Sequence, residues 1–184
     1  MEMEHALVIG GTGMISGVSK WLIKNVKYVS VVGRNQQRLQ QLHPGHDKNG
    51  FRPVSLDYKD TESLRQFLRQ SIQKNGPVDI VVSWIHSDAP DAIPTIFEEI
   101  NHCQQEQWRF VHIKGSSRDL PAIQSQITVP INCLYRDVQL GFKMEDDVSR
   151  WLTHEEISNG IISAIHHDRK KTIVGTLYPW EKRP

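Results

Sequence analysis

The sequence predicts an α/β protein in which a parallel sheet is covered by helices on both faces, a doubly wound arrangement in three layers. Short β-branched and apolar runs alternate with longer segments of helical periodicity along the 184 residues. Residues 6–9 are apolar at consecutive positions, which is typical of a strand buried on both faces of a parallel sheet. Because no linker, repeat or low-complexity tract interrupts the alternation, we expect a single domain over residues 1–184.

The alternation sets the order of the elements. The expected strands span residues 6–11, 28–33, 51–58, 78–85 and 108–117, one or two segments within 127–142, and 171–178. The expected helices span residues 16–25, 36–42, 60–74, 94–103 and 153–168. Right-handed crossovers between parallel strands then predict the strand order 3-2-1-4-5-6-7. In such a sheet a ligand binds beyond the carboxyl ends of the strands, near the switch between the first and fourth strands.

The strands are identified by apolar runs that end in turn-forming residues. Residues 28–33 form such a run and are followed by Arg34-Asn35. Pro53 lies near the start of the third strand, and because proline cannot donate to a ladder, it favours an edge position. Residues 127–142 are β-rich without a clear internal boundary, so one strand or two remain possible there.

The helices are identified by apolar spacing and by capping residues. Asp60 or Thr61 can cap the helix at 60–74, because short polar side chains accept the free N–H groups of a helix start. Pro94 suits the first turn of the helix at 94–103. Thr153 and Glu156 have the Thr-x-x-Glu spacing of a capping box, which predicts the start of the last helix.

The composition limits the classes of function. The chain has 22 Lys and Arg against 21 Asp and Glu, a formal net charge of +1, so we expect neither nucleic acid nor a membrane as partner. Cys103 and Cys133 lie far apart and outside any Cys-x-x-Cys spacing. We therefore expect no disulfide framework, no metal site and a cytoplasmic protein with reduced thiols. His43 and His46 have only Asp47 nearby as a further metal ligand, and we interpret them as part of a turn.

The turn after the first strand has the pattern of a phosphate-binding loop. It matches G-x-G-x-x-S from Gly11 or G-x-x-G-x-x-S from Gly10, and it stands between an apolar strand and a helix, as the motif requires. Backbone N–H groups at a helix N-terminus bind phosphate, and glycine lets the oxygens approach closely. The expected cofactor-binding residues are Gly10, Gly11, Thr12, Gly13, Met14 and Ile15. An ordinary strand–helix turn is the alternative.

The end of the second strand predicts which dinucleotide binds. An acidic residue there would bind the ribose 2′-hydroxyl of NAD, whereas arginine accommodates the 2′-phosphate of NADP. This strand ends at Arg34 and Asn35, and no acidic residue occurs between Asn25 and Asp47. Arg38 lies one helical turn further on. We therefore predict that NADP(H) is preferred over NAD(H), with a plain surface arginine as the alternative.

Together these motifs resemble the short-chain dehydrogenase/reductase superfamily, whose fold is a Rossmann-type sheet. The likeness is carried by the glycine turn at residues 10–17, by VVGRN at 31–35, by LDYKDTESL at 56–64 and by VDIVVSWI at 78–85. The glycine pattern is most similar to the extended and atypical branches. The resemblance covers residues 5–117 and resumes with the last helix and strand.

The resemblance implies further cofactor contacts. Asp57 would accept from the adenine amino group and Tyr58 would flank the ring, although Asp57 could also cap the next segment. Ser83, Trp84 and Ile85 stand where the family has an Asn-Asn-Ala-Gly segment beside the nicotinamide ribose.

The catalytic half of the family pattern is not expected in this chain. Family reductases carry a Tyr-x-x-x-Lys pair on a helix after the fifth strand, whereas only residues 118–126 separate that strand from the next β-rich segment. We therefore expect a shortened, atypical member with no Tyr-x-x-x-Lys spacing anywhere in its sequence, and the catalytic residues stay unassigned. Ser116 or Ser117 falls near the family's catalytic serine.

Four other residues could supply a proton, and for each a structural role is the alternative. They are His86, His112, Lys114 and Tyr135. Alternation along the fifth strand places His112 and Lys114 on one face, where they can meet a helix instead of the cofactor.

Two functions remain open, with a third less favoured. The first is an NADP(H)-dependent oxidoreductase acting on a small carbonyl or alcohol substrate. The second is a non-catalytic dinucleotide-binding protein with a redox-sensing or regulatory role. The third is an interaction module that has lost nucleotide binding, which the intact glycine turn argues against. Homo-oligomers also remain possible, because the helix that usually forms the family's dimer contact falls in the shortened segment.

Overall fold

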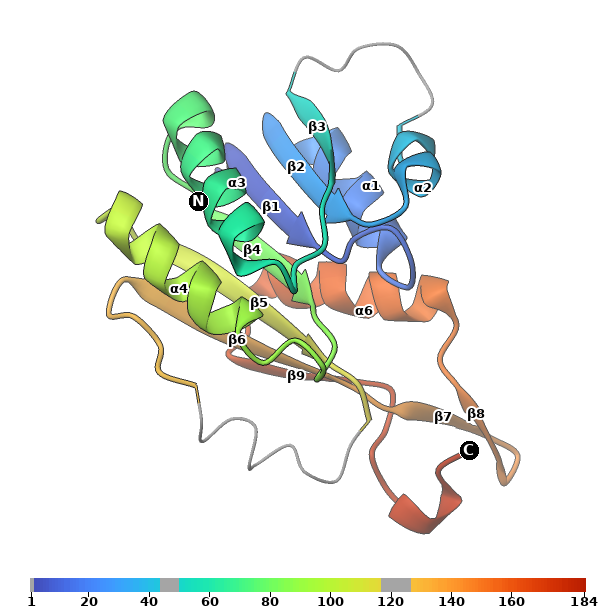
Figure 1. The fold of residues 1–184 in the computed structure, drawn as a ribbon. Coiled ribbons are helices and arrows are strands. Elements are labelled where there is room, and N and C mark those ends of the chain that lie inside the picture. Colours follow the sequence, from blue (N-terminus) through green and yellow to red (C-terminus); the bar gives the residue numbers. More distant parts are fainter. Residues whose placement is uncertain (1, 44–49, 117–126) are drawn as a thin grey trace.

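A computed structural model describes residues 2–43, 50–116 and 127–184, and its architecture is the predicted three-layer α/β fold (Figure 1). Within these residues seven parallel strands form one sheet in the order β3-β2-β1-β4-β5-β6-β9. The strands are β1 (His5–Ile9), β2 (Tyr28–Gly33), β3 (Phe51–Ser55), β4 (Ile80–Trp84), β5 (Trp108–Lys114), β6 (Cys133–Leu140) and β9 (Lys171–Val174). The predicted strand order is confirmed.

Helices pack on both faces of the sheet, each face with its own apolar cluster. The helices are α1 (Ser16–Asn25), α2 (Gln36–Gln41), α3 (Thr61–Asn75), α4 (Ala92–Cys103) and α6 (His154–His167), with a 3-10 turn, η1 (Trp180–Lys182). One cluster joins α1 and α6 to one face of the sheet, and the other joins α3 and α4 to the opposite face (Figure 1). No helix in the described ranges is long and apolar enough to cross a membrane.

The local signals at the helix starts are confirmed. Asp60 caps α3, because its carboxylate accepts the Ser63 N–H at 3.1 Å. Thr153 and Glu156 form the predicted capping box at α6, with reciprocal hydrogen bonds of 3.2 and 2.9 Å. Pro53 lies in β3, which is indeed an edge strand and pairs with β2 alone in the described sheet.

The segment after β6 contains an element that the sequence pattern did not predict. β7 (Phe142–Glu145) and β8 (Val148–Trp151) form an antiparallel hairpin that projects from the main sheet (Figure 1). Asp146 and Asp147 link the strands with φ values of 46° and 66°, as a tight type I′ turn requires. The β-rich pattern at 127–142 thus contains β6 and the first residue of the hairpin.

The helix that carries the glycine turn rests directly on α6. A Cβ atom at Gly17 of α1 would lie 2.6 Å from the Oγ atom of Ser158 in α6, so only glycine fits at this crossing. The close approach anchors the start of α1, and with it the preceding turn, to the helix that begins at the capping box.

Three features discussed from the sequence fall outside the described residues. They are His46 of the turn that begins at His43, Ser117, and the connection at 118–126.

Candidate functional site at the carboxyl edge of the sheet

The glycine turn leaves β1 through a backbone conformation that requires glycine at position 10. Gly10 has φ +76°, and a Cβ atom there would overlap the carbonyl oxygen of Trp84 at the end of β4. The N–H groups of Gly10 and Gly11 both point to the carbonyl oxygen of Val32, at 3.0 and 3.3 Å. The turn is therefore fixed between the carboxyl ends of β2 and β4, at the switch point of the sheet.

Gly11 and Gly13 differ in what surrounds them. A Cβ atom at Gly11 would crowd Ser19, Val8 and Val31 at 2.5–2.7 Å, so helix packing alone demands this glycine. Apart from its two chain neighbours, no described residue has an atom within 4 Å of a Cβ atom at Gly13, and its φ is not in the left-handed region. Neither packing against the described residues nor backbone geometry explains the glycine at position 13.

The other residues of the turn bring backbone groups to the same place. The Ile15 side chain is fully buried and Met14 packs partly buried against the same cluster, so the backbone of Ile15 is the part that can meet a ligand. Thr12 lies against Gly33 at the end of β2, where a Cβ atom would be 2.6 Å from its methyl group. No side chain caps the N-terminus of α1 and its first turn has no acidic residue, which leaves the positive end of the helix dipole unneutralised.

Two arginines lie beside the turn, after β2. Arg34 and Arg38 are both exposed, and neither forms an ion pair with another described residue. The side chain of Asn35 caps α2 by accepting the N–H of Arg38 at 3.0 Å. Asn35 thus has a structural role, and the two guanidinium groups supply the positive charge.

The loops after β3 and β4 contact each other across the edge. The Tyr58 hydroxyl accepts the N–H of His86 at 3.2 Å, and Lys59 pairs with Asp88 at 2.5 Å. The hydrogen bond with Asp88 raises the pKa of Lys59 and lowers that of Asp88. Asp57 accepts the N–H of Lys59 at 3.0 Å, so it does cap the next segment. A carboxylate has further acceptor sites, so this contact is compatible with adenine binding.

The three residues expected beside the nicotinamide ribose point in different directions. Ser83 is fully buried and its hydroxyl lies 3.4 Å from the carbonyl oxygen of Val111 in β5. Ile85 packs against the cluster beneath α3 and α4, whereas Trp84 packs against the cluster beneath α1 and α6. Only Trp84 has a side chain that lies along the carboxyl edge, close to Gly115 after β5.

The ionisable candidates on β5 are paired and buried. His112 Nδ1 lies 2.6 Å from the Tyr135 hydroxyl, and Lys114 Nζ lies 2.8 Å from an Asp137 carboxylate oxygen, with side chains only 5% and 6% exposed. His112 and Lys114 share one sheet face, as alternation predicts, and it is the face of α3 and α4. Burial lowers the pKa of His112 to about 4, aided by Lys114, and burial raises the pKa of Tyr135. Neither group titrates near neutral pH.

Neither a protein-family model nor a curated protein matches this chain. Solved structures do. An alcohol dehydrogenase from the archaeon Thermococcus sibiricus, complexed with 5-hydroxy-NADP, matches with a TM-score of 0.70 at 13% identity, over 100% of this chain and 99% of that one. A short-chain dehydrogenase from Burkholderia cenocepacia in complex with NADP matches with a TM-score of 0.68 at 14% identity, over 94% and 96% of the two chains. The short-chain dehydrogenase/reductase from Serratia marcescens matches with a TM-score of 0.66 at 14% identity, over 94% and 97%.

The chain has the short-chain dehydrogenase/reductase fold. That result confirms the resemblance at the level of architecture. At this level of identity the likeness shows the fold alone, so the function of the site has to be inferred from the side chains of this chain.

One expectation about the short-chain dehydrogenase/reductase pattern is wrong in detail. A Tyr-x-x-x-Lys spacing does occur, at Tyr178 and Lys182 in the sequence YPWEK. It lies after β9, not on a helix after β5. Tyr178 is 74% exposed, and Lys182 pairs with Asp147 of the hairpin at 3.3 Å. Because η1 starts only at Trp180, the two residues do not form one turn of an α-helix, and the family's arrangement of the pair is not reproduced.

The serine near the end of β5 is held by its backbone. The carbonyl oxygen of Ser116 accepts a hydrogen bond from the guanidinium of Arg183, which lies near the rings of Trp151 and Trp180. The Ser116 hydroxyl is buried without a hydrogen-bond partner in the described part of the chain.

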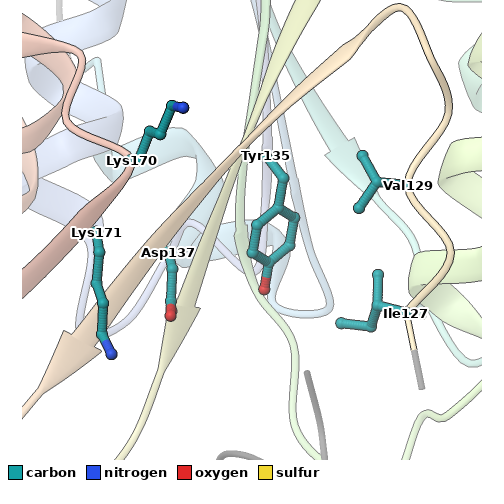
Figure 2. Close-up of a pocket in the computed structure, with 6 residues that line it drawn as sticks. All are labelled: Ile127, Val129, Tyr135, Asp137, Lys170 and Lys171. Atoms are coloured by element: carbon teal, nitrogen blue, oxygen red, sulfur yellow. The ribbon is translucent and has the colours of Figure 1, made fainter. Parts of the chain in front are cut away.

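Two surface hollows lie away from the glycine turn. One of about 470 Å³ is lined by Arg52 and α3, and the other of about 390 Å³ is lined by Ile127, Val129, Tyr135, Asp137, Lys170 and Lys171 (Figure 2). Neither includes an expected cofactor residue. No group of three or more His, Cys, Asp or Glu side chains among the described residues is placed to bind a metal ion.

Proposed function

We propose that this protein binds NADP(H) across the carboxyl edge of its sheet, with the phosphates on the glycine turn at residues 10–13. The observation that carries the proposal is Gly13, a glycine that faces open space at an uncapped helix N-terminus. A Cβ atom there would occupy the approach of a phosphate without crowding any of the residues that the structure describes. Structures of the same fold that contain NADP or 5-hydroxy-NADP support the choice of ligand class.

Arg34 and Arg38 would hold the 2′-phosphate, which is the basis for preferring NADP(H) over NAD(H). Both side chains are exposed and without an ion-pair partner in the described residues, and planar guanidinium groups suit phosphate. Asp57 and Tyr58 would meet the adenine, from the loop that Lys59 ties to Asp88.

The role that these residues support best is non-catalytic nucleotide binding in a cytoplasmic protein, in which occupancy regulates another process. NADP(H), when bound, supplies hydride chemistry, and the protein must then supply a proton near the nicotinamide. His112 and Lys114 are buried in pairs on the α3 and α4 face, away from that task. An atypical oxidoreductase acting on a small carbonyl or alcohol is the second candidate, favoured by exposed His86, whose ring lies 5.5 Å from that of Trp84.

The proposal is tested by titrating the full chain with NADPH and with NADH, for the wild type and Gly13→Ala. We expect NADPH to bind more tightly than NADH, and Gly13→Ala to lose affinity by roughly 10- to 100-fold, because charge-assisted hydrogen bonds to phosphate contribute about 1.5–3 kcal/mol. The thermal midpoint should not change, since nothing surrounds the new methyl group. A wild type that binds neither nucleotide, or an unaffected Gly13→Ala, would refute the proposal.

A further inference from the structure

The carboxyl edge of the sheet has two sides that differ in what covers them. A dinucleotide bound to a doubly wound sheet lies across the switch point, so each half rests on one side of it. We call the ends of β1, β2 and β3, with Gly13 and Arg34, the phosphate side. The ends of β4, β5 and β6, with Trp84, are the indole side.

Trp84 covers the indole side along the sheet edge. It is the last residue of β4, and its ring atom Cη2 lies 3.5 Å from the position of a Cβ atom at Gly115, the residue after β5. The indole therefore reaches from the end of one strand to the end of the next. It packs against the cluster beneath α1 and α6, to which Met14 of the glycine turn and Leu152 also pack.

The position of Trp84 is fixed by its own backbone and by a second ring. Its carbonyl group packs directly against Gly10, so the end of β4 cannot move without displacing the glycine turn. On its other side, the imidazole of His86 meets the indole edge-on, with centroids 5.5 Å apart. The ring is thus held in the space between the glycine turn and the end of β5.

The ionisable groups of β5 and β6 lie on the face of the sheet opposite to the Trp84 ring. Trp84 is two residues after Val82, whose side chain belongs to the α1 and α6 cluster, so both lie on that face. His112 and Lys114 lie on the opposite face and are engaged by Tyr135 and Asp137. A nicotinamide ring on the α1 and α6 face would therefore meet the Trp84 indole and none of these ionisable groups.

We infer that Trp84 fills the nicotinamide half of the site, so that the protein recognises only the adenosine 2′-phosphate and pyrophosphate portion of its ligand. The inference rests on the proposed function, because it assumes that the phosphate side binds a 2′-phosphorylated nucleotide. NADP⁺ and NADPH then bind equally well, with the nicotinamide left in solvent. The protein responds to the total NADP(H) concentration, not to its redox ratio.

The test compares calorimetric affinities of the full chain for 2′,5′-ADP, NADP⁺ and NADPH. We expect the three to agree within about threefold in the wild type. In Trp84→Ala the two dinucleotides should gain about tenfold over 2′,5′-ADP, whose affinity stays unchanged, because removal of the indole opens space for nicotinamide. Trp21→Ala is the matched control, since Trp21 packs against the same cluster from α1 and should leave the three affinities equal.

The outcomes separate the two proposals. Binding of NADP⁺ or NADPH to the wild type more than about tenfold tighter than 2′,5′-ADP overturns the role of Trp84 and leaves the NADP(H) site standing. Absence of binding by all three overturns both. If Trp84→Ala does not fold, the emission of NADPH bound to the wild type decides: an unchanged nicotinamide spectrum supports a ring in solvent, and a blue-shifted, enhanced emission contradicts it.

Discussion

The phosphate side and the indole side of the same sheet edge use their residues in opposite ways. On the phosphate side, backbone at Gly13 is open and Arg34 is exposed without an ion-pair partner among the described residues. On the indole side, Trp84 lies over the strand ends and Lys114 is buried in an ion pair beneath them. Phosphate recognition needs only backbone donors and surface cations, whereas redox catalysis also needs an ionisable group at the reacting atom. The two requirements are separate, and the proposed function depends only on the first.

The largest expected effect concerns the buried ion pair on the indole side. Lys114→Met should lower the free energy of unfolding by about 3–5 kcal/mol, because it leaves the Asp137 carboxylate buried without its ammonium partner. The double change Lys114→Met/Asp137→Leu should recover most of this loss in urea unfolding. If the two sides are independent, NADPH affinity stays unchanged in the double variant. A single variant as stable as the wild type would show that the pair is not a structural element.

The second effect is a pH dependence from His112. Burial lowers the pKa of this residue from 6.5 to about 4, so between these values the unfolded chain binds a proton that the folded chain does not. Stability should therefore be complete above pH 6.5 and decrease by about 3 kcal/mol as the pH falls toward 4. Urea unfolding of His112→Gln across this range should show a flatter profile. Parallel profiles for the two proteins would contradict a buried, neutral His112.

A third effect belongs to the phosphate side. Arg34→Gln should weaken NADPH binding by roughly 10- to 100-fold and leave NADH binding unchanged, because only NADPH carries the 2′-phosphate that a guanidinium can hold. Arg169→Gln, an exposed arginine after α6, serves as the control and should affect neither nucleotide. Equal losses for NADPH and NADH would assign Arg34 to the pyrophosphate, and no loss would leave it a surface residue.

The smallest effect is expected at the contact between the two sides. Lys59 and Asp88 are an exposed pair, 44% and 60% accessible, and such pairs contribute little to stability. Asp88→Ala should leave the midpoint of urea unfolding unchanged and alter NADPH affinity by less than about twofold. A large loss of affinity would mean that the two sides are coupled through this pair and not independent.

Local signals made the course of the glycine turn and the helix caps predictable. The glycine turn, the arginine after β2 and the caps at Asp60 and Thr153 are each determined by residues a few positions apart, and their physical reasons act within that distance. The strand order followed from right-handed crossovers between successive parallel strands.

The indole side depends on contacts between distant segments. No local pattern pairs Lys114 with Asp137, since strand register alone brings β5 and β6 together. The β7–β8 hairpin was not predicted although Asp146-Asp147 is a suitable turn, because the β-rich pattern at 127–142 ends at the first residue of the hairpin. The Tyr178–Lys182 spacing is present in the sequence, but only the structure shows that it follows β9 and does not span a turn of α-helix.

Because Gly17 packs closely against Ser158, the position of the start of α1 depends on α6, a helix near the other end of the sequence. Ser158 is not one of the candidate binding residues, yet a larger side chain there would push α1 away and tilt the N–H groups of the proposed phosphate site. Selection for nucleotide binding would thus act on α6 through volume alone. When related proteins are compared for loss of nucleotide binding, substitutions at this helix crossing should be considered together with those at the proposed binding residues.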